Sequence, residues 1–302
     1  MTPGQPSAPA SLAPGLTLAL VGAIAFSGKA IIVKLAYRYG VDAVTLIMLR
    51  MLFALPIFAV MAWLASRGKP PLTRRDWMGV VGLGVIGYYL SSFLDFAGLQ
   101  YISASLERLI LYLNPTLVVL LGWLMVRKPF RPLQVAGMAL SYCGVLLVFG
   151  QEIGVQGPQA ALGALLVFAS AVTYAIYLVY SGQLVQRLGA LRLVGLATTV
   201  ACLCCLVQFA VLRPVEAALA VAPEVVWLSV LNATLCTAVP VLMVMMAIER
   251  IGPALAAQAG MVGPMSTILM GVFLLGEPFT AWIAVGTLLV IAGIYVFSRA
   301  GR

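Results

Sequence analysis

Apolar runs of about 20 residues follow one another along almost the whole chain, and only short polar loops separate them. A run of this length crosses the hydrocarbon core of a bilayer as one helix. Of the 302 residues, 63% are hydrophobic and 9% are charged, whereas a soluble domain has roughly 45–50% and about 25%. The runs are continuous rather than alternating, which excludes a membrane β-barrel. We therefore predict an all-α integral membrane protein with ten transmembrane helices, near residues 14–34, 43–65, 76–98, 103–126, 132–150, 159–181, 190–212, 223–247, 253–275 and 281–298.

Histidine and cysteine carry much catalytic and cofactor chemistry in proteins. Here histidine is absent, and the cysteines lie within apolar segments. The chain has no histidine, so haem ligation, most catalytic zinc sites and histidine acid–base chemistry are excluded. Its five cysteines lie inside apolar runs, and we interpret them as buried small hydrophobic residues. No Gly-rich loop ending in Lys-Ser/Thr is present for ATP hydrolysis. We predict no enzyme activity, no cofactor and no metal site.

Basic residues give the chain a net charge of +9 and gather in alternate loops, most clearly in residues 66–76. Nucleic-acid binding would need them on a soluble face, so the predicted partners are a small solute and the lipid bilayer. The positive-inside rule places these loops and both termini in the cytoplasm, which leaves Lys34, Arg38 and Arg213 outside. Residues 1–13 carry no basic residue, so we interpret the first apolar run as a retained helix rather than a signal peptide. We predict a multi-pass protein of a bacterial inner membrane.

An internal repeat appears when the sequence is shifted by 149 positions without a gap. The shift aligns a mid-helix proline, a Pro-Phe turn and three glycines, a combination that chance rarely produces. The aligned pairs are Ile102 and Ile251, Leu106 and Leu255, Pro115 and Pro264, Gly122 and Gly271, Pro129-Phe130 and Pro278-Phe279, Gly137 and Gly286, and Gly144 and Gly293. Because each unit has five helices, the second copy enters the membrane upside down. Inverted repeats of this kind support alternating access in transporters.

The repeat predicts the domain organisation of the chain. A tail at 1–13 precedes a first five-helix repeat at 14–150, and a connection at 151–158 leads to the inverted repeat at 159–298 and a tail at 299–302. One turn differs between the copies, since Arg127-Lys128 occupies the place of Gly276-Glu277. The two turns face opposite sides of the membrane, and the positive-inside bias explains this exchange of charge.

Two stretches resemble a known family of membrane proteins. Residues 98–105 (GLQYISAS) with Asn114-Pro115 and Pro129, and residues 247–278 with Gly263-Pro264 and Gly276-Glu277-Pro278, are similar to the repeat signature of the drug/metabolite transporter superfamily. The resemblance covers essentially the whole chain and points to the ten-helix EamA-type branch. It implies two inverted repeats around a central cavity lined by helices 1, 3, 4, 6, 8 and 9, and the export of amino acids or other metabolites, aromatic amino acids above all. The family's acidic residue in the first turn is replaced by Lys128, which we interpret as a topological difference.

Five charged residues inside predicted spans are candidates for a gate or for ion pairs, because each charge costs about 2.5–3.5 kcal/mol on insertion scales. All five lie in the first repeat, toward the outer half of the membrane: Lys29, Arg50, Asp95, Glu107 and Arg108. The functional interpretation is an outer gate whose pairs break and form. The alternative is static pairing that fixes helix packing, such as Asp95 with Lys29 or Arg50.

Polar and aromatic residues near mid-span are candidates for a substrate cavity. Helical spacing places Tyr88, Ser92 and Asp95 on one face. The cavity candidates are Tyr88, Ser92, Tyr112, Asn114, Tyr174, Tyr177, Asn232, Gln258 and Met261. Plain helix packing is the alternative for the tyrosines and the methionine. The matched prolines Pro115 and Pro264 are hinge candidates, with static kinks as the alternative.

These residues favour a secondary exporter of amino acids, with aromatic and other large apolar ones as substrates. Basic side chains suit a substrate carboxylate, while acidic and aromatic side chains suit its ammonium group. Export of a cationic drug or another small metabolite is the nearest alternative. An intramembrane enzyme would need a catalytic cluster, and a channel would need rings of like residues in an oligomer. One chain contains both repeats, so a monomer or a weak dimer suffices.

Overall fold

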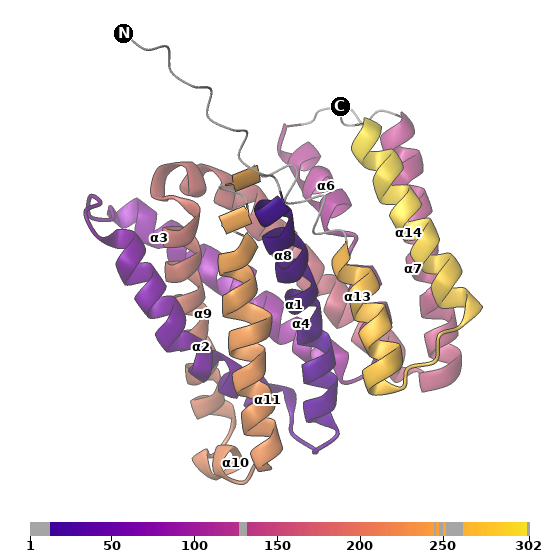
Figure 1. Cartoon of the computed structure of the whole chain (residues 1–302), viewed down its shortest axis with the longest axis horizontal. Helices are drawn as coiled ribbons and strands as arrows, with labels where there is room; N and C mark the ends of the chain where they lie inside the picture. Colours follow the sequence, from indigo (N-terminus) through magenta and orange to yellow (C-terminus); the bar gives the residue numbers. More distant parts are fainter. Residues whose placement is uncertain (1–12, 127–131, 245, 248–249, 252–261, 301–302) are drawn as a thin grey trace, which may run out of the picture.

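The computed structural model describes residues 13–126, 132–244, 246–247, 250–251 and 262–300, and all regular structure in them is helical. The helices are α1 (Ala13–Tyr37), α2 (Ala43–Ser66), α3 (Arg74–Leu83), α4 (Ser91–Leu99), α5 (Ala104–Leu111), α6 (Asn114–Val126), α7 (Pro132–Gln156), α8 (Gln159–Leu188), α9 (Ala190–Leu212), α10 (Val215–Leu219), α11 (Pro223–Ala233), α13 (Val262–Met270) and α14 (Ala281–Ala300). Three segments have π-helical hydrogen bonding: η1 (Gly84–Leu90), η2 (Thr234–Ala238) and η3 (Gly271–Leu275). The helices form one bundle (Figure 1).

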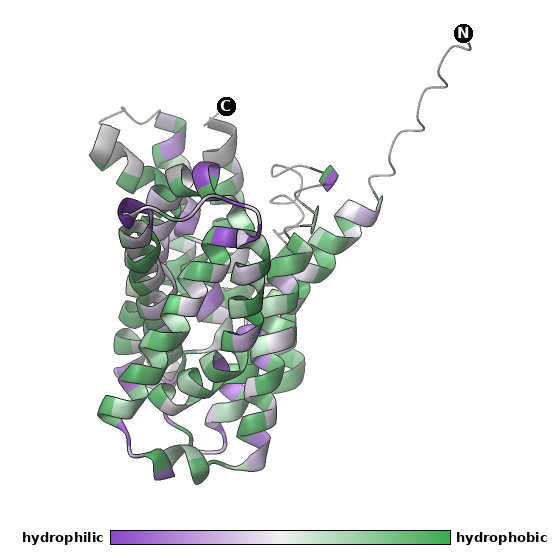
Figure 2. Cartoon of the chain, turned by 90° about the vertical axis from the view of Figure 1, so that its left-hand side faces the viewer, coloured by the Kyte–Doolittle hydropathy of each residue, from purple (hydrophilic) through white to green (hydrophobic). Residues whose placement is uncertain are grey.

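The helix lengths and the surface of the bundle fit a membrane. Eight described helical stretches are long and apolar enough to span it, and two shorter apolar ones, Met265–Leu275 and Ala281–Val296, bring the number to ten. Figure 2 shows mostly hydrophobic residues along the sides of the bundle. The start of α1 and the end of α14 lie at the same end (Figure 1), as an even number of crossings requires. The prediction of a ten-helix all-α membrane protein is confirmed.

Two helices extend beyond their predicted ends. Residues 151–156, predicted as part of the connection between the repeats, continue α7 up to Gln156. The helix stops only at Gly157, whose φ of 80° is a left-handed conformation, followed by Pro158. Similarly, α8 continues past 181 to Leu188, where Gly189 with a φ of 84° ends it. Helix-stop residues, rather than the end of the apolar run, therefore set both boundaries.

The last helices of the two repeats, α7 and α14, pack side by side through matched glycines (Figure 1). A Cβ on Gly144 would lie 2.6 Å from the carbonyl oxygen of Gly286, and a Cβ on Gly293 would lie 2.6 Å from that of Gly137. The repeat pairs Gly144 with Gly293 and Gly137 with Gly286, so each contact is the repeat image of the other. This exchange requires an antiparallel pair, and it shows the inverted symmetry directly.

Substitution of Gly144 by alanine should force α7 and α14 apart, because the added methyl meets backbone atoms that cannot move aside. We expect the free energy of unfolding to fall by about 1–3 kcal/mol, measured by thermal unfolding of the protein in detergent. Gly150→Ala on the same helix is the matched control, since its Cβ would meet open space. An unchanged midpoint for Gly144→Ala would show that the two helices do not touch there.

Two of the three π-helical segments, η1 and η2, also obey the repeat, whereas the image of η3 at residues 122–126 belongs to α6. A shift of 149 positions carries residues 84–90 onto 233–239, which contain η2. It pairs Tyr88 with Thr237, and both side chains make contacts at the candidate site described below. Short π-helical segments are frequent at functional sites, because they rotate the following side chains relative to an α-helix.

Candidate functional site

A buried ion-pair network lies between α1, α4 and α5. Lys29 Nζ lies 2.5 Å from Asp95 Oδ2 and 3.4 Å from Glu107 Oε1, and Arg108 Nε lies 3.8 Å from Glu107 Oε2. The four side chains are buried, with Glu107 fully enclosed. The structure thus brings together four of the five charged candidates. Asp95 pairs with Lys29 rather than with Arg50.

Arg50 of α2 approaches the same region but makes different contacts. Its Nε and Nη2 donate to Thr237 Oγ1 at 3.3 and 3.1 Å, and its guanidinium lies 5.2 Å from the ring centre of Phe96. Thr237 belongs to η2 and donates in turn to the carbonyl oxygen of Asn232. Arg50 therefore links the first repeat to the second.

Charge and hydrogen bonding in this group are not balanced. With all five side chains ionised, three positive and two negative charges leave an excess of one positive charge. Six of their buried atoms lack a hydrogen-bond partner among the described residues: Arg50 Nη1, Asp95 Oδ1, Glu107 Oε1, Glu107 Oε2, Arg108 Nε and Arg108 Nη2. Buried polar atoms are normally paired, so the group can accept an additional anionic or zwitterionic partner.

Three tyrosines form a second group on helices η1 and α8. The hydroxyls of Tyr88 and Tyr177 lie 3.2 Å apart, with the rings edge to face at 4.9 Å between centres. Tyr174 stacks on Tyr177 at 5.6 Å. Along the helix, Tyr88 precedes Asp95 by seven residues, a rise of about 10 Å. The aromatic group and the charged group thus lie about two turns apart.

The remaining cavity candidates have varied surroundings. Asn232 is buried, with Nδ2 3.5 Å from the carbonyl oxygen of Lys29. Asn114 and Tyr112 are half-buried where α5 meets α6. Ser92 is half-buried, but the interhelical contact is made by its neighbour Ser91, whose hydroxyl lies 3.1 Å from that of Ser170. Gln258 and Met261 lie outside the described residues.

The fourth predicted span, residues 103–126, is divided into two helices near Pro115 rather than kinked within one helix. It consists of α5, ending at Leu111, and α6, beginning at Asn114. Pro115 therefore stands in the first turn of α6, where a helix tolerates the missing N–H. Pro264 lies in α13, which is described from Val262 onward. A hinge role for these prolines remains a prediction.

Glu277 makes the most extensive polar contact that the sequence analysis missed. Its carboxylate accepts hydrogen bonds from the backbone amides of Ala104 and Ser105 at 2.7 and 3.2 Å, and from the Ser105 hydroxyl at 2.7 Å. Gly271 leaves room for this carboxylate, because a Cβ there would lie 2.8 Å from Oε2. Glu277 thus fastens the turn before α14 to the start of α5, and we call this contact the Glu277 clasp. The matched turns pointed to the position but not to its partner.

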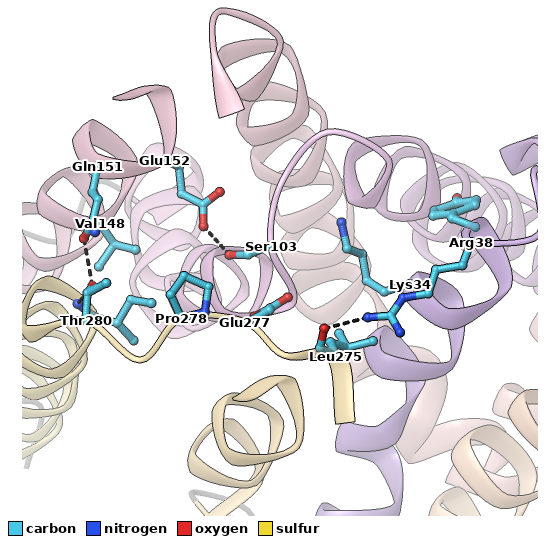
Figure 3. A pocket seen from close by; sticks show the side chains of 12 residues that line it. Lys34, Arg38, Ser103, Val148, Gln151, Glu152, Leu275, Glu277, Pro278 and Thr280 are labelled. Carbon is cyan, nitrogen blue, oxygen red and sulfur yellow. Dashed lines mark hydrogen bonds between the residues drawn. The ribbon is translucent and has the colours of Figure 1, made fainter. Parts of the chain in front are cut away.

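A pocket of about 350 Å³ adjoins the Glu277 clasp (Figure 3). Lys34 and Tyr37 line it, so it lies beside the end of α1 that is opposite the helix start at Ala13. Its walls come from α1, the start of α5, the end of α7 and residues 275–283. Twelve residues line it: Lys34, Tyr37, Arg38, Ser103, Val148, Gln151, Glu152, Leu275, Glu277, Pro278, Thr280 and Ile283.

Comparison with known proteins identifies the family. The EamA-like transporter family matches residues 13–150 and 161–299. An uncharacterized transporter of Bacillus subtilis, YcbK, is 30% identical over 279 residues, which cover 88% of this chain and 86% of that protein. An uncharacterized transporter of Archaeoglobus fulgidus is 23% identical over 283 residues, covering 93% and 96%. A solved crystal structure with 20% identity superposes with a TM-score of 0.61 over 96% of this chain and 98% of that one, which supports the fold. The chain belongs to the EamA-like transporter family.

Proposed function

We propose that this transporter exports amino acids, aromatic and other large apolar ones above all, from the cytoplasm across a bacterial inner membrane by alternating access. Both termini are cytoplasmic in this proposal, as the basic loops favour. The observation that carries the substrate class is the buried charged group with one excess positive charge and unpartnered atoms of both signs.

A zwitterion complements this group. A carboxylate can accept from Arg108 Nη2 and Arg50 Nη1, and an ammonium group can donate to Asp95 Oδ1. The tyrosine group lies on the same helix about two turns away and offers an aromatic surface for the side chain. An excess positive charge disfavours a cationic drug, so the amino-acid proposal is preferred.

Transport by the purified protein in liposomes tests this proposal. We expect saturable uptake of labelled phenylalanine, tyrosine and leucine. We expect weak competition from 3-phenylpropionate, since it lacks the ammonium group. A set of experiments with and without a pH gradient decides whether a proton moves with the solute. Folded protein that carries none of these amino acids would contradict the substrate and leave the family assignment intact.

Arg108→Gln should lower the rate of phenylalanine transport at low concentration by about 10- to 100-fold, the equivalent of one charge-assisted hydrogen bond of about 1.5–3 kcal/mol. Arg108→Lys keeps the charge but not the planar fork, so we expect an intermediate rate. Arg213→Gln is the matched control, because Arg213 is exposed and pairs with Asp42 at 3.4 Å, away from the charged group. Undiminished transport by folded Arg108→Gln protein would remove Arg108 from the substrate path.

A further inference from the structure

The pocket beside the Glu277 clasp contains a buried carboxyl group that is only half satisfied. Glu152 is 8% exposed, and one of its oxygens accepts a hydrogen bond from Ser103, as Figure 3 shows. The other oxygen, Oε2, has no hydrogen-bond partner among the described residues. No ion pair within the described part of the chain includes Glu152.

The other charged residues of the pocket wall are engaged elsewhere. Lys34 Nζ donates to the carbonyl oxygens of Leu99 and Ile102 at 3.2 and 2.9 Å. Arg38 Nη2 donates to the carbonyl oxygen of Leu275 at 2.6 Å (Figure 3). Glu277 is held in its clasp. Glu152 thus has an enclosed acceptor without a partner among the described residues, and its side chain lines a cavity that has room for more than one water molecule.

We infer that this pocket is a second ligand site, distinct from the charged group in the bundle, and that it binds a small organic ammonium ion. Oε2 is enclosed in the structure, so the ammonium group donates to it once the Glu152 carboxyl group turns toward the cavity. The organic part of the ligand lies against the apolar wall formed by Tyr37, Val148, Leu275, Pro278 and Ile283. Lys34 and Arg38 also line the pocket and keep their positive charges, but both already donate to backbone carbonyls. Glu152 Oε2 has no hydrogen-bond partner among the described residues, so the pocket favours a ligand that donates a hydrogen bond over an anion. The inference holds whichever solute the protein transports.

The pocket lies between the two repeats, so a bound ligand affects their movement during the transport cycle. Helices α1, α5 and α7 belong to the first repeat, whereas residues 275–283 belong to the second. An ammonium ion bound to Glu152 therefore contacts both repeats at the end where the Glu277 clasp already joins them. It stabilises the closed arrangement of that end relative to any open one.

Ligand-dependent thermal unfolding of the full-length protein in detergent tests the site, with 2-phenylethylammonium as the probe. A ligand that binds only the folded state raises the midpoint, and we expect a rise of about 5 °C or more near saturation. 3-Phenylpropionate, which has the same ring and a carboxylate instead, should give no rise. Glu152→Gln should abolish the effect of the amine, while its amide oxygen can still accept from Ser103 and preserve the fold.

Two further variants separate the possible outcomes. Glu224→Gln, a change at an exposed carboxylate in the first turn of α11, should leave the rise intact. Asp95→Asn should also leave it intact, because Asp95 belongs to the other group. A rise that Asp95→Asn abolishes and Glu152→Gln preserves would overturn the inference by placing the amine in the charged group. No rise in the unmodified protein would overturn it as well.

Discussion

Lys29→Met is expected to lower the free energy of unfolding by about 3–5 kcal/mol, the usual cost of removing one partner from a buried ion pair. The substitution leaves Asp95, 3% exposed, without its partner at 2.5 Å, and it takes from Glu107 the nearer of its two cations. Thermal or denaturant unfolding in detergent measures the loss. Lys69→Met is the matched control, because Lys69 lies in a loop and makes one 3.4 Å hydrogen bond to a carbonyl oxygen, so about 0.5 kcal/mol is expected.

The double variant Lys29→Met with Asp95→Leu distinguishes static packing from a role in transport. Replacing both members of a buried pair by apolar residues is often neutral, so most of the lost stability should return. We expect transport to stay at least about tenfold below that of the unmodified protein, because a carboxylate that we assign to the substrate ammonium is gone. Recovery of both stability and transport would mean that the pair only fixes helix packing.

Glu277→Ala is expected to have the second largest effect, through loss of the Glu277 clasp. Three hydrogen bonds to a carboxylate disappear, and the first amides of α5 lose their acceptor. We expect the free energy of unfolding to fall by about 3 kcal/mol, since hydrogen bonds to charged groups contribute about 1.5–3 kcal/mol each and do not add fully. Glu224→Ala, at an exposed helix start, should cost no more than about 1 kcal/mol.

Chemical labelling shows whether the clasp also keeps its end of the bundle closed. Val148 is a buried residue of the pocket wall, so a Val148→Cys variant, in a chain whose five native cysteines are replaced by alanine, reports access to the pocket. We expect a membrane-impermeant maleimide to react at least about tenfold faster when Glu277→Ala is added. Equal labelling rates with and without Glu277→Ala would show that the clasp stabilises α5 without closing this end.

The sequence gives a reason to expect such a clasp at only one end. The repeat aligns Glu277 with Lys128, Ala104 with Pro253 and Ser105 with Ala254. In the sequence the matching positions thus hold a cation in place of the carboxylate, a proline without an N–H in place of one amide donor, and no hydroxyl. The five buried charged residues likewise occur in the first repeat alone. The residues at the matching positions of the second repeat are uncharged: Leu178, Thr199, Val244, Ala256 and Ala257. The two halves thus share a repeat in sequence but not the charged residues.

The number of helices and their inverted repeat followed from the sequence, because span length and hydropathy are local properties that a bilayer enforces. The matched glycines predicted the repeat, and the structure showed their purpose in the contact between α7 and α14. The charged residues were also identified as exceptional, since a charge within an apolar run is costly wherever it points.

Only the tertiary structure decided which of these groups meet. Arg50 donates a hydrogen bond to Thr237, which lies 187 positions away along the chain. Glu277 accepts one from Ser105, which lies 172 positions away. Such partners depend on which helix faces touch, and the π-helical segments rotate those faces in a way that apolar periodicity does not reveal. The pocket at Glu152 likewise arises where four separate segments converge. Hydropathy along one helix determines that it spans the membrane, whereas the pairing of its polar atoms is fixed by neighbours far away in the sequence.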